Sequence, residues 1–267
     1  MNAPASRADR VQALLAKRGD LRRTAVLLLG GEGPVWPRAR IAVFDAPVDA
    51  AAARAWLPPG LRSSDPARAT IFVADYPETT FGVAYREAGV LLHAVHRRRP
   101  VLHCAWMVVD NDTALILGRE LLGFPKKLAE IDFLMDAGSA TARVRRGGVS
   151  LIAFHMEGAG PRSDREPFTR PIVNARGIPS LLPAVLYRMD VPQRVHEGRR
   201  GTMTVEIGGS AADPLDRFGV GKREIPGDAM VADLAVPPAA RRSVPPVRPV
   251  GLVRPTWLAK HYPERAW

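Results

Sequence analysis

Cysteine and long apolar runs are the two features that this sequence of 267 residues most clearly lacks. Its one cysteine, Cys104, cannot form a disulfide within the chain, so we expect a reducing, cytoplasmic location. No apolar run approaches the roughly eighteen residues that span a bilayer, so we expect no membrane partner. Residues 1–23 contain no continuous apolar centre and are not predicted to be a secretory signal.

Several motifs that would define other functional classes are also missing. His93, His96 and His103 lie near Cys104, but their spacing matches no standard zinc pattern, so no metal is predicted. The run at 219–223 lacks the first glycine and the final Ser or Thr of a phosphate-binding loop. No glycine-rich dinucleotide turn follows a strand, so we predict no cofactor. In the absence of a helix-turn-helix, zinc finger or aromatic RNA-binding motif, no specific nucleic-acid partner is expected.

Positive charge is abundant and unevenly distributed. The net charge is +11, and the last 29 residues contribute +5 of it, from six basic residues against one acidic residue. Residues 235–257 contain six prolines, which preclude a regular helix. We therefore interpret 238–267 as an extended Pro/Arg-rich tail. An anion- or partner-binding role for this tail is one hypothesis, and long-range attraction of small anions by the net positive charge is another.

Short segments of strand character, separated by turn residues, make up most of the remaining sequence. This pattern favours a mostly antiparallel sheet over alternating βαβ units. We predict helices at 7–17 and 48–56, and strands at 41–44, 69–74, 89–96, 101–109, 140–145, 149–156, 167–173, 185–188 and 201–207.

Two adjacent lysines follow a predicted helix stop. Asn111 and Asp112 are candidate N-caps, and Gly123 with Pro125 ends the helix. A strand is predicted at 128–134, so the lysine pair at 126–127 lies where helix passes into strand. Because successive strand residues point to opposite faces, only one of the two is expected to face a given cavity.

This placement suggests amine chemistry. A neighbouring positive charge and removal from water both disfavour the protonated form of a lysine. A neutral amine can then attack a ketone and form a Schiff base. The alternative interpretation is a solvated charge pair at the start of a strand, since lysines are rarely buried.

The segment 85–129 resembles the acetoacetate decarboxylase family. The matching pieces are Tyr85-Arg86-Glu87, Val109-Asp110-Asn111-Asp112, Gly118-Arg119-Glu120 and Gly123-Phe124-Pro125-Lys126-Lys127. Acetoacetate decarboxylase is itself the usual example of a lysine activated by a cationic neighbour. The lysine chemistry and the resemblance are therefore not independent.

The resemblance implies both a fold and a set of catalytic residues. The implied fold is α+β, mostly antiparallel β, with a closed cone-like β-barrel and flanking helices. The implied catalytic residues are Lys126, which forms the imine, Lys127, which perturbs it, and Glu87, an active-site carboxylate. The implied domain spans 36–237, between an N-terminal helix and arm at 1–35 and the tail at 238–267.

Two positions depart from the family's pattern. A second acidic residue is expected near 71–73, but Ile71, Phe72 and Val73 are all apolar. The substrate-binding arginine is expected at Arg40 or Arg38, where the correspondence slips by one residue.

The predicted function is a Schiff-base-forming lyase acting on a small keto acid, with acetoacetate-type decarboxylation to a ketone and CO2 as the first hypothesis. An aldolase–dehydratase that condenses pyruvate with an aldehyde is the alternative, and a non-catalytic anion- or partner-binding protein is the second. The expected partners are the keto-acid substrate and further copies of the chain in a homo-oligomer.

Overall fold

The computed structural model describes residues 33–136, 139–157, 160–176, 184–236 and 247–253, together with Trp257 and His261. Strands predominate in these residues, alongside two α-helices, α2 (Ala50–Trp56) and α3 (Asp112–Leu122), and the short 3-10 helix η1 (Leu215–Phe218). The prediction of a strand-rich chain with few helices is confirmed. The helix predicted at 7–17 lies outside the described residues.

The strands form one large sheet. Its order is β14-β11-β10-β5-β4-β3-β1-β13-β12-β9-β8-β7, with β2 attached to β4 and β6 attached to β5. Most neighbours are antiparallel, whereas β5 pairs in parallel with β10 and β6. The strands are β1 (Val35–Pro47), β2 (Arg62–Ser63), β3 (Arg68–Tyr76), β4 (Tyr85–His96), β5 (Arg99–Val109), β6 (Lys126–Leu128), β7 (Glu130–Met135), β8 (Ala140–Arg146), β9 (Val149–Met156), β10 (Ile172–Arg176), β11 (Ala184–Met189), β12 (Gln193–Ile207), β13 (Lys222–Ala235) and β14 (Val247–Val253).

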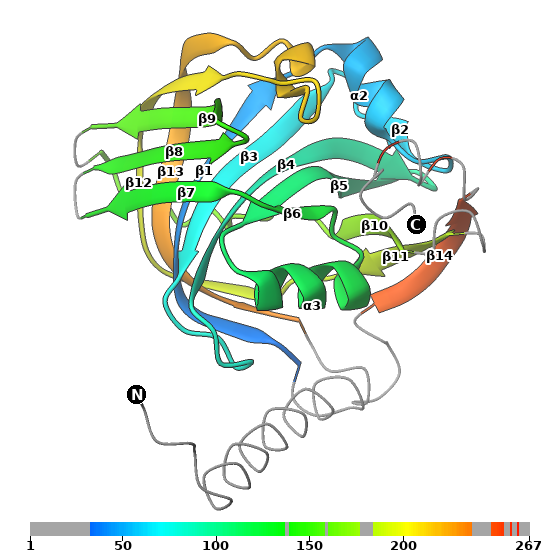
Figure 1. Cartoon of the computed structure of the whole chain (residues 1–267), viewed down its shortest axis with the longest axis horizontal. Coiled ribbons are helices and arrows are strands. Elements are labelled where there is room, and N and C mark those ends of the chain that lie inside the picture. Colours follow the sequence, from blue (N-terminus) through cyan, green and yellow to red (C-terminus); the bar gives the residue numbers. More distant parts are fainter. Residues whose placement is uncertain are drawn as a thin grey trace, which may run out of the picture.

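The sheet is strongly curled, as Figure 1 shows, but the predicted closure into a barrel is not observed among the described strands. The hydrogen-bonded path begins at β14 and ends at β7 without returning. The chain leaves β5 after Ala129, whose N–H donates to the carbonyl of Val109 at 3.0 Å. From there β7 pairs with β8 instead. Among the described strands the sheet is therefore curled, and the expected closed barrel is not confirmed.

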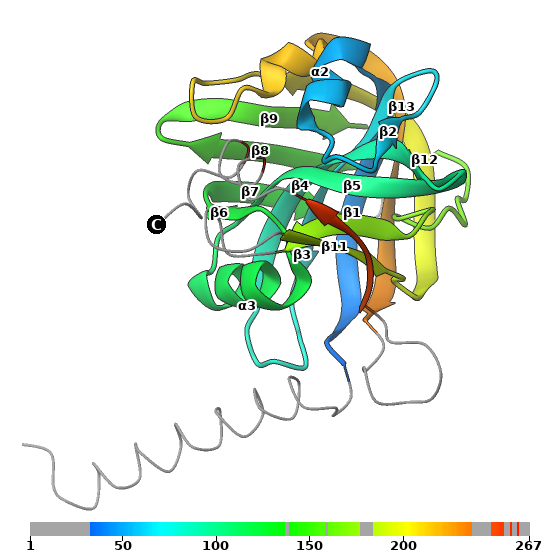
Figure 2. The ribbon, with the colours of Figure 1, turned by 90° about the vertical axis from the view of Figure 1, so that its right-hand side faces the viewer.

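The central strands β1, β3, β4 and β5 are buried on both faces. Phe44 and Trp106 belong to the larger apolar cluster on one face, whereas Phe72 and Met107 belong to a second cluster on the other. Helix α3 adds Ala114 to that second cluster. Figure 2 shows α2 and α3 at opposite ends of the molecule. Burial on both faces removes the apolar–polar alternation that one-sided strands show.

Some segments differ from the sequence prediction. Strand β10 begins at Ile172 rather than at 167, because the backbone of Phe168 in the preceding loop bonds to a side chain: its N–H donates to Gln193 Oε1 at 2.9 Å, and its carbonyl accepts from Gln193 Nε2 at 2.7 Å. Strand β13 was not predicted. Part of the predicted tail, Val247–Val253, is strand β14 and pairs with β11.

No helix in the described residues is both long and apolar enough to cross a bilayer.

Candidate active site

Local sequence signals end helix α3 directly before the lysine pair. The Asn111 side chain caps its start by accepting from the N–H of Ala114 at 3.0 Å. Gly123 ends it in the left-handed conformation, with φ of 69°, as predicted. Strand β6 then pairs with β5, which places Lys126 beside Met107.

The side chain of Lys126 is buried, with only 5% of the residue exposed. Its Nζ lies 2.5 Å from Oε2 of Glu87, which is itself 6% exposed. The same nitrogen lies 5.2 Å from the ring centre of Tyr85 and 5.9 Å from that of Phe124. An amine and a carboxylate therefore face each other between aromatic rings and away from bulk water.

Two tyrosines complete the polar part of this site. Burial, followed by the negative charge of Glu87, raises the pKa of Tyr76 and of Tyr85 well above the ordinary value. Both hydroxyls hydrogen bond with Glu87, and Trp36 donates from its indole to the Tyr85 hydroxyl at 2.9 Å. Both phenols therefore stay protonated at neutral pH and remain able to donate to the carboxylate.

These groups line a cavity of about 50 Å³ in the second apolar cluster. Of its sixteen lining residues only Lys126 and Glu87 are charged, so water is poorly held there. The other lining residues are Trp36, Phe72, Tyr76, Tyr85, Leu91, Met107, Leu122, Phe124, Phe168, Ile172, Met189, Val191, Leu234 and Val236.

Helix α3 makes room for the lysine through a glycine. A Cβ at Gly118 would lie 2.5 Å from Cε, 2.6 Å from Cδ and 2.9 Å from Nζ of Lys126. These separations are far shorter than van der Waals contact. The glycine of the Gly-Arg-Glu motif therefore lets the lysine side chain pass against the helix.

Lys127 points away from this cavity. Its Nζ lies 3.0 Å from Oδ1 of Asp213, which is 1% exposed. Asp213 also accepts from the indole of Trp106 at 2.8 Å and from Arg146 at 2.6 Å. Burial alone would raise the pKa of Asp213, but the hydrogen bonds from Trp106 and Lys127, with the Lys127 charge, hold it below its ordinary value. The two lysines thus occupy opposite faces of β6, as the strand geometry predicts.

Neither predicted arginine lines the cavity. Arg38 lies in a bulge of β1 with φ of 47°, and its side chain reaches toward Glu197 at 3.7 Å. The Arg40 side chain is about half exposed and lies 3.5 Å from Asp75. The bulge shifts the register of β1, and both side chains pair with carboxylates outside the cavity rather than pointing to Lys126.

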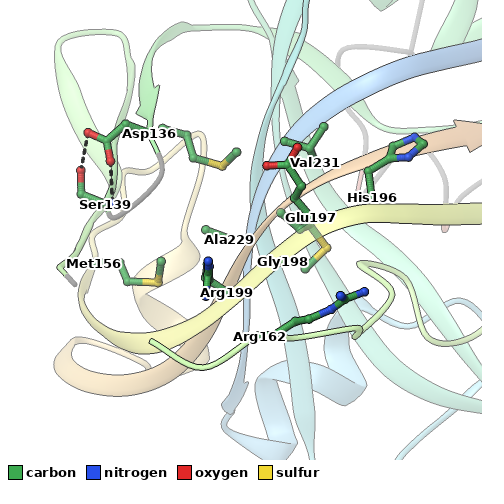
Figure 3. A pocket seen from close by; sticks show the side chains of 12 residues that line it. Asp136, Ser139, Met156, Arg162, His196, Glu197, Gly198, Arg199, Ala229 and Val231 are labelled. Carbon is green, nitrogen blue, oxygen red and sulfur yellow. Dashed lines mark hydrogen bonds between the residues drawn. The ribbon is translucent and has the colours of Figure 1, made fainter. Parts of the chain in front are cut away.

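A second cavity, of about 250 Å³, lies over β12 and β13 (Figure 3). Its charged side chains have partners of their own, for example Arg162 with Asp164 at 3.0 Å and His196 with Asp233 at 2.9 Å. It contains no lysine. We therefore take the Lys126 cavity as the candidate active site.

Sequence reasoning missed Asp213 and assigned no role to Tyr76 or Tyr85. The only local signal for Asp213 was its Asp-Pro turn, which says nothing of its partners. The described residues contain no group of three His, Cys, Asp or Glu side chains arranged for a metal.

Comparison with known proteins identifies the family. The sequence profile of the acetoacetate decarboxylase (ADC) family matches residues 30–239. The chain therefore belongs to this family.

Three individual relatives share between 18% and 30% sequence identity with this chain. The chain is 30% identical over 142 residues to Decarboxylase DEC1 of Cochliobolus heterostrophus, a match that covers 51% of this chain and only 56% of that protein. The acetoacetate decarboxylase structure from Legionella pneumophila is 19% identical, with a TM-score of 0.72, over 84% of this chain and 89% of that one. The enduracididine biosynthesis enzyme MppR, solved with the condensation product of pyruvate and imidazole 4-carboxaldehyde, is 18% identical with a TM-score of 0.62, over 76% of this chain and 87% of that one. Both structures share the fold.

The cytoplasmic location, the homo-oligomer and the three-part domain division stay predictions.

Proposed function

We propose that this protein decarboxylates a small 3-oxo (β-keto) acid through an imine formed on Lys126. The observation that carries the proposal is the buried Nζ of Lys126, 2.5 Å from the Glu87 carboxylate in a cavity with no other charged lining residue. Away from water, the carboxylate can accept the ammonium proton and leave a nucleophilic amine.

The proposed reaction balances without a further reactant. The neutral amine adds to the ketone carbon, and loss of water gives a protonated imine. The bond to the carboxylate then breaks, its electrons pass to the imine nitrogen, and CO2 and an enamine form. A proton added to the enamine carbon restores the imine, and water hydrolyses it to the ketone and free lysine.

Each polar residue of the site has a proposed part. Glu87 takes the proton from Lys126 and moves protons during the addition and release of water. Tyr76 and Tyr85 are neutral phenols that hydrogen bond with Glu87 and hold that carboxylate in place. We assign Lys127 a positioning part, because its ammonium binds Asp213 on the other face of β6.

The composition of the cavity favours decarboxylation over aldol condensation. In an aldol reaction of pyruvate the carboxylate stays in the product and needs a lasting partner, whereas in decarboxylation it leaves as neutral CO2. The cavity offers no cation besides Lys126. A carboxylate in such surroundings loses its hydration, which raises its energy relative to CO2.

Borohydride trapping tests the proposal. Reduction in the presence of acetoacetate is expected to attach the ligand at Lys126, as located by peptide mass mapping, and CO2 release is expected without borohydride. Lys126→Met should abolish both. The matched control is Lys222→Met, which changes an exposed lysine of β13 and should affect neither.

Other results would select the other hypotheses. Trapping of pyruvate at Lys126 with aldehyde condensation and no gas release would establish the aldolase–dehydratase alternative. Absence of any trapped ligand, together with anion or partner binding that survives Lys126→Met, would contradict imine chemistry and favour a binding protein.

A further inference from the structure

The apolar wall of the Lys126 cavity is longer than a four-carbon acid requires. Glu87 and Leu91 both line it from β4 and are four strand residues apart, a distance of about 13 Å. Four carbon atoms joined by three bonds span only about 3.8 Å, the separation of neighbouring Cα atoms. Most of the wall would therefore not touch acetoacetate.

Beyond Lys126 and Glu87, aromatic rings form part of the cavity wall. Gly89 lies between Glu87 and Leu91, and a Cβ there would lie 2.7 Å from the ring of Phe72. The ring of Phe72 packs edge-on against Phe168 at 5.1 Å between centres. The absence of a side chain at Gly89 thus lets a ring form this part of the wall.

The cavity walls can also adjust. Met107 and Met189 both line the cavity, and methionine side chains repack readily around ligands of different shape. The present volume of about 50 Å³ is therefore a lower bound for what the site admits.

Charge excludes another class of ligand. The two arginines predicted to bind the substrate, Arg38 and Arg40, pair instead with Glu197 and Asp75, and no arginine or histidine is among the lining residues. A second carboxylate on the substrate would be buried there without a cationic partner, which is strongly unfavourable.

We propose that the substrate is a 3-oxo monocarboxylic acid that carries an apolar alkyl or aryl chain where acetoacetate has its methyl group. This inference rests on the imine chemistry proposed for Lys126. The chain lies along the β4 wall toward Leu91 and Phe168, while the ketone lies at Lys126.

Three acids test the proposal: acetoacetate, 3-oxohexanoate and 3-oxoadipate. The last two have the same number of carbons and differ in whether the chain ends in a methyl group or a carboxylate. Burying one methylene group strengthens binding about fourfold. The two additional methylenes of 3-oxohexanoate should therefore raise its kcat/KM at least about tenfold above that of acetoacetate. For 3-oxoadipate we expect kcat/KM at least about 100-fold below that of 3-oxohexanoate. Rates are corrected for spontaneous decarboxylation.

A substitution at the half-buried Val191 provides a second test. Val191→Lys adds a cation to the lining and should raise kcat/KM for 3-oxoadipate while lowering it for 3-oxohexanoate. Val191→Met has a similar length without the charge and should not favour 3-oxoadipate.

The outcomes separate this inference from the proposed function. Trapping at Lys126 with equal kcat/KM for all three acids, or with 3-oxoadipate preferred by the unmodified protein, would overturn the chain preference alone. Failure to trap any of the acids would overturn the imine chemistry and this inference together.

Discussion

Lys126 and Lys127 are consecutive residues whose ammonium groups bind different carboxylates. Lys126 pairs with Glu87, whereas Lys127, together with Trp106 and Arg146, donates to Asp213. Because Asp213 neutralises Lys127, we expect Lys127→Met to shift the pH dependence of kcat/KM by less than about half a unit. Loss of the charged hydrogen bond should lower the free energy of unfolding by about 1.5–3 kcal/mol.

Urea unfolding and pH–rate profiles of Lys127→Met check this prediction. A shift of more than one pH unit with unchanged stability would instead show that Lys127 acts on Lys126 through its charge. Strand alternation sufficed to place the two lysines on opposite faces. It did not reveal Asp213, because that contact joins positions 86 residues apart.

At the scale of elements, helix α3 and strand β6 form the site together, and Gly118 sets their separation. We expect Gly118→Ala to stabilise the helix by up to about 1 kcal/mol, since alanine has the higher helix propensity. The new methyl group must displace the end of the Lys126 side chain from Glu87. A misplaced reactive group of this kind should cost between about tenfold and 100-fold in kcat/KM.

Thermal unfolding and borohydride trapping of Gly118→Ala test this separation of stability from activity. Ile116→Ala, at an exposed position of the same helix, is the control and should leave trapping unchanged. Full activity in Gly118→Ala would mean that the lysine does not need its observed position.

Helix α3 was predictable because its signals are local: Asn111 at the start, and Gly123 with Pro125 at the end. Strand β13 was not predicted, although it lies inside the sheet between β1 and β12. Its sequence contains Pro226 and Gly227, and its pairing with β1 and β12 comes from residues far away in the chain. The order of strands in the sheet was not predictable for the same reason, since distant pairing partners decide it and no local pattern encodes them.

At the scale of the whole molecule, a buried histidine takes part in joining β5 to its parallel neighbour β10. His103 is fully buried, and its Nδ1 donates to the carbonyl of Val173 at 2.8 Å, although sequence spacing offered it only as a rejected metal ligand. Burial lowers the pKa of His103 to about 4, from an ordinary value of 6.5. Between these values the unfolded chain binds a proton that the folded protein excludes.

The contribution of His103 to the free energy of unfolding should therefore be present in full above pH 6.5. As the pH drops toward 4 this contribution should be lost, by up to about 1.4 kcal/mol per pH unit. His103→Gln preserves a donor but removes the titration, so its unfolding free energy should decline less steeply with acid. Urea unfolding of both proteins near pH 7 and near pH 5 measures the difference in slope, in which the other titrating groups cancel. Parallel curves would mean that the folded protein protonates His103 as readily as the unfolded chain does, and that its burial does not contribute to acid sensitivity.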